Sequence, residues 1–254
     1  MMTFFRDSWI VFKRAIIISS QNPLWIVIGL LQPILYLALF GPLLTQMAGM
    51  PGFPPGNAWL VFVPGLLVQL GIFGGAFVGF AIIYEWRSGV IDRQMVSPAS
   101  RAALIVGRVM RDIVVLFIQG CLLSGAAFLF GLAVPLHALA LGLLLMVLLG
   151  ASFSALSYAA GLALKSEDSF APIVNTFALP ILLLSGILLP MSLAPGWLQV
   201  LSDLNPFKHM VTALRFVFRD EIWNGTVLLG FGLAVALLVL SAWVGTRVFE
   251  RQTK

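Results

Sequence analysis

The chain has 254 residues, of which 60% are hydrophobic and only 10% carry a charge. A soluble domain carries about 25% charged residues, so this composition excludes an ordinary soluble protein. The mean hydropathy of +1.04, together with a net charge of +5, indicates an integral membrane protein with basic loops.

The beginning of the chain, residues 3–20, predicts an amphipathic helix in the membrane interface. Phe5 and Trp9 belong to an apolar series at helical spacing, and charged residues occupy the remaining helix surface. A plain extension of the first span is the alternative. It is disfavoured because Asn22 and Pro23 interrupt the helix before the first span begins.

Six charge-free segments are long enough for a helix to cross the hydrocarbon core, which takes about 20 residues. They are residues 24–44, 59–84, 113–134, 138–164, 170–190 and 226–246. Continuous apolar runs exclude the strands of a membrane barrel, which alternate over about 10 residues. We therefore expect a single all-α integral membrane domain over residues 1–254, with six transmembrane helices.

Lysine and arginine are distributed unequally between the two sides of this six-span layout. Cytoplasmic loops retain these residues, so the richer side is the inner one. With the N-terminus inside, the inner side holds Arg6, Lys13, Arg14, Arg87, Arg93, Arg101, Arg108, Arg111, Lys165, Arg247, Arg251 and Lys254. The outer side holds only Lys208, Arg215 and Arg219. We therefore expect both termini to be cytoplasmic, and the spread of cations over four inner segments gives no reason to expect nucleic-acid binding.

The inner loop over residues 85–112 holds eight of the 25 charged residues. Within it, Ser97 suits a helix N-cap and Pro98 suits the first helical position, so we expect an irregular segment followed by a new helix. Such a loop is either a docking surface for a soluble partner or an ordinary basic loop. Charge alone leaves both interpretations open.

Motifs for enzymatic chemistry are absent from the sequence. It contains no phosphate-binding loop, no H-E-x-x-H and no G-x-S-x-G, and its two histidines are far apart. We therefore expect no catalytic residue, no metal and no cofactor bound by this chain. The six segments also contain no Asp, Glu, Lys or Arg, which an ion-coupled carrier normally needs, so energy for transport is expected from outside the bilayer.

The second span predicts two different helix faces. Gly71, Gly75 and Gly79 recur every four residues, a pattern that lets another helix approach closely. On another face lie Gln69, Phe73 and Phe77.

Other polar side chains in apolar helices are Gln32 and Tyr36 in the first span and Asn175 in the fifth. Together with Gln69, Phe73 and Phe77 these residues either line a substrate path or form interhelical hydrogen bonds and core contacts. For the individual residues we slightly favour the second interpretation.

The segment over residues 191–215 remains apolar, but Pro190, Pro195 and Gly196 break any continuous helix. We expect it to re-enter the outer leaflet as one or two short helices. The alternative is an interfacial loop anchored by Trp197.

Two stretches resemble a known family. The sequence YEWRSGVIDR over residues 84–93, followed by SPASR over residues 97–101, resembles the E-R-E-x-G-T-L-x-x-L…P-x-S-R pattern after the second span of ABC-2 type permeases. Residues 180–215 resemble the signature of that family around its fifth span. The matching residues there are Pro180, Ser185, Gly186, Pro190, Pro195, Trp197, Leu198, Asn205, Pro206, Ala213, Leu214 and Arg215.

This resemblance implies the membrane subunit of an ATP-driven exporter in the bacterial cytoplasmic membrane. A second permease subunit would complete the path, and two separate ATPase subunits would carry ATP and Mg. The resemblance makes the loop over residues 85–112 the coupling element, with roles for Glu85, Arg87, Gly89, Arg93, Pro98 and Arg101. It also implies an outer re-entrant element that caps the exit, with Ser185, Gly186, Pro190, Trp197, Asn205, Pro206 and Arg215.

The cargo is expected to be hydrophobic or amphipathic, because the chain has 20 Phe against three Tyr and no charge in its charge-free segments. Among branches of the family, drug and antibiotic exporters fit best. Export of a lipid-linked glycan or another lipid is the alternative. An alternative from a different functional class is a membrane assembly or scaffold subunit that carries no cargo.

Overall fold

The computed structural model describes residues 2–21, 24–48, 50–51, 53–54, 57–96 and 100–252. All regular structure in this part of the chain is helical. The helices are α1 (Met2–Gln21), α2 (Leu24–Met47), α3 (Ala58–Ala76), α4 (Gly79–Arg87), α5 (Val90–Met95), α6 (Arg101–Leu129), α7 (Leu136–Leu164), α8 (Glu167–Leu184), the 3₁₀ helix η1 (Met191–Leu193), α9 (Gly196–Asp203), α10 (Pro206–Phe218) and α11 (Gly225–Gln252).

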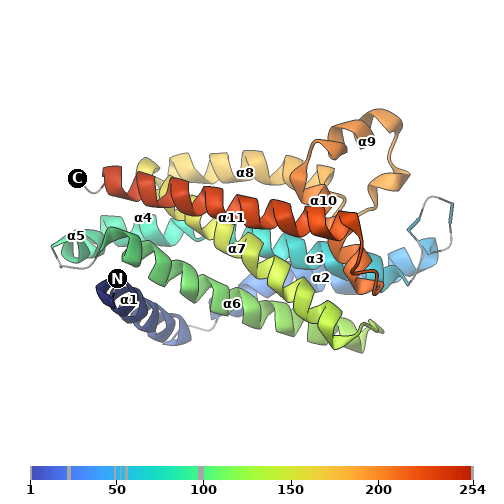
Figure 1. The fold of residues 1–254 in the computed structure, drawn as a ribbon, viewed down its shortest axis with the longest axis horizontal. Coiled ribbons are helices and arrows are strands. Elements are labelled where there is room, and N and C mark those ends of the chain that lie inside the picture. Colours follow the sequence, from blue (N-terminus) through green and yellow to red (C-terminus); the bar gives the residue numbers. More distant parts are fainter. Residues whose placement is uncertain are drawn as a thin grey trace.

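Six segments of the described chain are long and apolar enough to cross a membrane, which confirms the expected all-α, six-span fold. They are Ile26–Met47, Ala58–Arg87, Ala102–Leu129, Leu136–Leu164, Glu167–Leu184 and Gly225–Val248. Both chain ends and α5 lie at one end of the bundle, and α9 lies toward the other (Figure 1). This arrangement is consistent with both termini and the charged segment sharing one side of the membrane, although which side they share stays a prediction.

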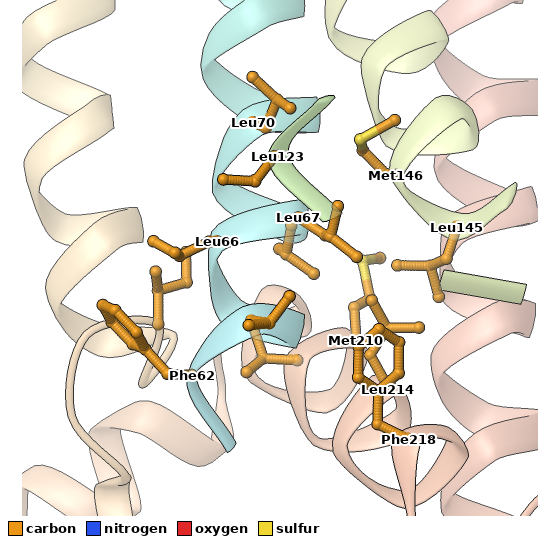
Figure 2. Close-up of a cluster of buried hydrophobic side chains, with 14 of the residues drawn as sticks. Phe62, Leu66, Leu67, Leu70, Leu123, Leu145, Met146, Met210, Leu214 and Phe218 are labelled. Atoms are coloured by element: carbon orange, nitrogen blue, oxygen red, sulfur yellow. The ribbon is translucent and has the colours of Figure 1, made fainter. Parts of the chain in front are cut away.

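The core forms around α3, which packs against α7, α2, α10 and α6. Phe62 and Leu66 of α3 are 1% and 0% exposed. Leu67 lies beside Met210 and Leu214 of α10 in the same cluster (Figure 2). A helix that is apolar on all sides is the expected centre of a bundle, because every face can then be buried.

The join between α3 and α4 depends on a serine from another helix. The chain turns at Phe77 and Val78, which leaves backbone groups of the two helix ends without intrahelical partners. Ser157 of α7 satisfies two of them: its Oγ accepts a hydrogen bond from the Gly79 N–H at 2.8 Å and donates one to the Ala76 carbonyl oxygen at 2.5 Å. The second span is therefore two helices joined over α7.

The helix of the third span begins before the charge-free segment that was predicted for it. Helix α6 begins at Arg101, so residues 101–112 are its first three turns rather than part of a loop. Its N-cap is Ser100, whose Oγ accepts a hydrogen bond from the Ala103 N–H at 3.2 Å, and the predicted cap Ser97 lies outside the described residues together with Pro98. The new helix expected after residues 97–98 is therefore present and begins at Arg101, and it is continuous with the span that was predicted from residue 113.

The fifth span also ends earlier than predicted. Helix α8 stops at Leu184 instead of residue 190, because Gly186 adopts a left-handed φ of 71° and turns the chain. Three short helices follow, η1, α9 and α10, where one or two were expected. At the start of α10, Asn205 Oδ1 accepts a hydrogen bond from the Phe207 N–H at 3.0 Å, and Pro206 occupies the first position.

Helix α1 lies along α6. The backbone of Ser8 and the side chain of Val11 approach Gly107 so closely that a larger residue there would clash with both. Phe5 and Trp9 are 65% and 50% exposed, so the apolar face points away from the bundle. This orientation suits a helix in the membrane interface, which remains a prediction, and Asn22 and Pro23 lie outside the described residues.

Candidate functional site

The charged end of the bundle contains a bend between two helices, which we call the α4–α5 elbow (residues 85–95). Helix α4 ends at Arg87 and α5 begins at Val90. Between them Gly89 has a φ of +69° and no atom within 4 Å of the position of an added Cβ. The glycine is therefore required by backbone conformation rather than by space.

An ion pair connects the elbow to α6. Arg108 Nη2 donates hydrogen bonds to Glu85 Oε2 at 2.6 Å and to Gln94 Oε1 at 2.8 Å, and its Nη1 donates to the Leu104 carbonyl oxygen at 3.2 Å. The side chain of Arg108 is only 6% exposed, whereas that of Glu85 is 34% exposed. One arginine of α6 therefore contacts the C-terminal ends of both α4 and α5.

A second charged group continues from this ion pair into the bundle. Tyr158 Oη of α7 donates a hydrogen bond to Asp112 Oδ2 at 2.7 Å and accepts one from Arg111 Nη2 at 3.2 Å. Arg111 Nε also lies 3.2 Å from Asp112 Oδ1, and the Asp112 side chain is 3% exposed. Buried charges are tolerated when they are paired and hydrogen-bonded, so this cluster fixes α6 against α7.

A third contact reaches α8. Arg87 Nη1 lies 3.4 Å from Glu167 Oε1 in the first turn of α8, and both side chains are about half exposed, at 50% and 46%. Next to this pair, the Lys165 ammonium lies 4.9 Å from the ring centroid of Trp86. The elbow is thus tied by charged side chains to α6, to α8 and to the turn before α8.

These contacts connect the elbow to two other helices. Arg108 links it to α6 through a largely buried arginine, and Arg87 links it to α8 through a half-exposed ion pair of a kind that contributes about 1 kcal/mol or less. Packed helices move relative to one another mainly as rigid bodies, so such contacts are the points at which the elbow and these two helices are joined.

The predicted coupling residues divide into three groups. Glu85 faces the bundle, where Arg108 engages it, while Arg87 and Arg93 are exposed. Arg101 is the first residue of α6, its side chain is not among those described, and Pro98 lies outside the described residues.

The predicted path residues are not brought into one cavity. Gln32 Nε2 donates a hydrogen bond to Tyr36 Oη at 3.2 Å on α2, and Asn175 is exposed on α8. On α3, Gln69 is 1% exposed and its Oε1 is buried without a hydrogen-bond partner, while Phe77 is 40% exposed.

Phe73 and Phe77 stack with ring centroids 6.2 Å apart, and Phe73 is partly buried against the core. Two cavities in the described chain, of about 520 and 210 Å³, include none of the six predicted path residues.

The glycine stripe of the second span faces α7. An added Cβ would lie 2.6 Å from the Met146 carbonyl oxygen at Gly71, 2.5 Å from the Gly150 carbonyl oxygen at Gly75, and 2.6 Å from the Ser157 carbonyl oxygen at Gly79. All three of these partners are backbone atoms of α7, so α3 and the start of α4 lie closer to α7 than any larger residue permits.

At the end of the bundle away from the elbow, a cavity of about 520 Å³ lies between the end of α8, η1 and α10. Four residues of the predicted re-entrant element line it: Ser185, Gly186, Pro190 and Arg215. Of the others, Asn205 and Pro206 start α10, and Trp197 is 70% exposed on α9.

The sequence reasoning missed the partners that organise the elbow. Arg108 and Asp112 belong to α6, where their spacing of four residues puts them on one helix face, and this spacing was the available signal. Tyr158 comes from α7, which contains no charged residue, so the sequence of α7 gave no signal that it contacts Arg111 and Asp112. Arg108, Arg111 and Asp112 lie inside Ala102–Leu129, just before the charge-free segment 113–134 that was predicted as the third span.

The fold and the charged elbow define a multi-pass helical membrane protein with a structured polar end. Comparison with known proteins narrows this class. The sequence pattern of the ABC-2 type transporter family matches residues 6–218, and the chain belongs to this family.

Several relatives align over most of their length. The chain is 25% identical to the "Putative transport permease ycf38" of Cyanophora paradoxa, over 99% of this chain and 90% of the relative. It is 25% identical to the daunorubicin resistance ABC transporter permease protein DrrB1 of Streptomyces coeruleorubidus, over 90% and 78%. It is also 27% identical to the inner membrane transport permease YadH of Escherichia coli K12, over 81% and 79%.

Proposed function

We propose that this chain is the permease subunit of an ATP-driven exporter, and that separate ATPase subunits bind it at the α4–α5 elbow. The observation that supports this most is the way Arg108 and Arg87 tie the elbow to α6 and α8. A basic loop that served only topology would need no such contacts. The family and the names of its relatives support a transport role.

The elbow has separate faces for docking and for transmission. Arg93 in the elbow and Val96 directly after it are exposed, with Val96 at 88%, and these residues are available to a soluble partner. Glu85 faces inward to Arg108 and carries the movement into α6. Charged residues suit the docking face because they specify the partner and its register while staying soluble when it is absent.

A second permease subunit would complete the path. Gln32 and Asn175 are exposed on helices that would otherwise face hydrocarbon, where polar groups are costly. A second copy or a related chain, packed against α2 and α8, would remove these side chains from lipid. The path then runs between subunits rather than through a cavity of one chain.

The proposed cargo is a hydrophobic or amphipathic compound of the drug or antibiotic class. The support is the resistance named for the relative DrrB1 and the apolar character of the helices. Export of a lipid-linked glycan or another lipid is the alternative within the same mechanism. The scaffold alternative predicts no ATPase partner and no cargo.

The sidedness of the elbow is tested by labelling. Ser88 is exposed, so Ser88→Cys in a Cys121→Ser background gives one reactive thiol in the elbow. A membrane-impermeant maleimide should label it in inside-out vesicles and leave it unlabelled in intact cells. Labelling in intact cells would place the elbow on the wrong side for an ATPase.

Coupling is tested with the reconstituted complex. Arg87→Glu should leave assembly with the ATPase intact and abolish the stimulation of ATP hydrolysis by a panel of lipophilic drugs and lipids. Arg247→Glu is the matched control, because Arg247 lies at the same end of the bundle, and the contact recorded for it is with Trp243 of its own helix α11 rather than with the elbow. Equal stimulation in both variants removes Arg87 from coupling, and the failure of any ATPase to co-purify favours the scaffold alternative.

A further inference from the structure

The cavity at the end away from the elbow gathers positive charge. Only three Lys or Arg residues were assigned to that side of the membrane, and all three line the cavity: Lys208, Arg215 and Arg219. They belong to α10 and the residue that follows it, and they face the turn after α8. The preference of cations for the inner side explains why this side has few of them, but it does not explain why all three lie in one cavity.

Arg215 is a partly buried cation with neutral partners. Its Nε donates to the Val61 carbonyl oxygen at 2.9 Å and its Nη2 donates to the Gly186 carbonyl oxygen at 2.6 Å. No carboxylate of the described chain lies within ion-pair distance of it. Burial and the neighbouring charge of Arg219 lower the pKa of Arg215 to about 10, which still leaves it protonated at neutral pH.

The other two cations pair with exposed acids that do not line the cavity. Lys208 pairs with Asp203, and Arg219 Nε lies 3.3 Å from Glu221 Oε1. These carboxylate side chains are 60% and 51% exposed. The Arg219 Nε is buried, yet it has no aligned hydrogen-bond acceptor. Three cations therefore face two exposed carboxylates, which leaves one positive charge and at least one donor unsatisfied.

Apolar side chains complete the cavity wall. Phe53, Met191 and Phe216 line it beside the cations, and the Arg219 guanidinium lies 4.5 Å from the ring centroid of Phe216. A volume of about 520 Å³ is within the range of small-molecule sites and exceeds that of a single inorganic ion. The wall therefore suits a ligand with an anionic head and an apolar body.

We propose that this cavity binds the oxyanion headgroup of an amphiphile, with a phosphate ester as the best-matched group. Arg215 Nη1, which takes no part in the two hydrogen bonds above, and the Arg219 guanidinium can donate to phosphate oxygens, and Lys208 adds a third donor. The anion would neutralise the charge of Arg215, which is otherwise uncompensated. This site is independent of the proposed coupling to an ATPase, because it is formed entirely by this chain.

Binding is measured on the purified full-length chain in nanodiscs of neutral lipid. The probes are dioctanoyl phosphatidic acid, dioctanoylglycerol and inorganic phosphate. We expect phosphatidic acid to bind at least tenfold more tightly than either of the other two. Equal affinity of phosphatidic acid and dioctanoylglycerol would overturn the oxyanion site, and equal affinity of phosphatidic acid and inorganic phosphate would overturn the assignment to an amphiphile.

Two variants with opposite expected effects locate the site. Arg219→Gln should weaken phosphatidic acid binding at least threefold, whereas Glu221→Gln removes the competing carboxylate and should strengthen it. Arg247→Gln removes one charge elsewhere and should leave affinity unchanged. Equal weakening by Arg219→Gln and Arg247→Gln would overturn the proposal.

If Arg219→Gln does not yield monodisperse protein, Glu221→Gln still tests the site. Glu221→Gln alters only an exposed side chain, so this variant should fold. Unchanged or weaker phosphatidic acid binding in Glu221→Gln would then count against the site. Coupled ATP hydrolysis in the reconstituted complex is a separate readout, so failure of the headgroup site is distinguishable from failure of the exporter function.

Discussion

Replacing Gly75 by alanine tests how closely α3 and α7 pack. The added Cβ would lie 2.5 Å from the Gly150 carbonyl oxygen, 2.8 Å from Phe153 Cβ and 2.9 Å from the Ser154 backbone nitrogen. Ordinary contacts begin at 3.4 Å, and two of the three neighbours are backbone atoms that cannot rotate away. The helices would have to separate, and overpacking of this kind costs about 1–3 kcal/mol.

Alanine also improves helix propensity by up to about 1 kcal/mol relative to glycine, which partly offsets that cost. Gly232→Ala in α11 provides the control, because nothing lies within 4 Å of an added Cβ there and only the propensity effect remains. The free energy of unfolding of both variants would be measured by titrating the detergent-solubilised protein with SDS. Gly75→Ala should unfold more readily than Gly232→Ala by about 1–3 kcal/mol. Equal stability of the two variants would refute the close approach of the two helices.

Three other substitutions test individual features by the same unfolding measurement. Ser157→Ala should destabilise the protein by about 1–3 kcal/mol, because the Gly79 N–H and the Ala76 carbonyl lose their shared partner. Thr246→Val, which removes an exposed hydroxyl of α11, should cost much less, and a similar cost for both would contradict the bridging role of Ser157. Gly89→Val should cost at least about 1–2 kcal/mol because of the left-handed φ, and Gly89→Asn should be tolerated better, so equal stability of the two would argue against a conformational requirement. A double-mutant cycle of Glu85→Gln and Arg108→Gln should give a coupling energy of about 0.5–3 kcal/mol, and additive effects would mean that the ion pair contributes nothing.

The membrane-spanning helices were predictable because hydrocarbon imposes a simple requirement on the sequence. A chain of about 20 apolar residues satisfies its own backbone only as a helix, so composition and length fix the number of spans. Helix ends were less predictable. The end of α8 depends on the left-handed turn at Gly186, and glycine occurs too often in this sequence to mark a turn by itself.

The start of α6 shows why charge was a misleading boundary. Arg108, Arg111 and Asp112 interrupt the apolar pattern, yet the helix runs through them. Glu85, Gln94 and Tyr158 provide the partners that make charges acceptable in that helix. Those partners come from α4, α5 and α7, so no local pattern could have indicated them.

The sequence by itself determined the class of protein, the six spans and the charged segment, because these follow from which residues prefer hydrocarbon and which prefer water. Only the tertiary structure decided that Glu85 faces inward, that Gln69 is buried, and that Lys208, Arg215 and Arg219 share one cavity. The physical reason is that the free energy of a polar side chain in a membrane protein depends on its partners. Those partners lie on other helices, and only the packing of the helices brings them into contact.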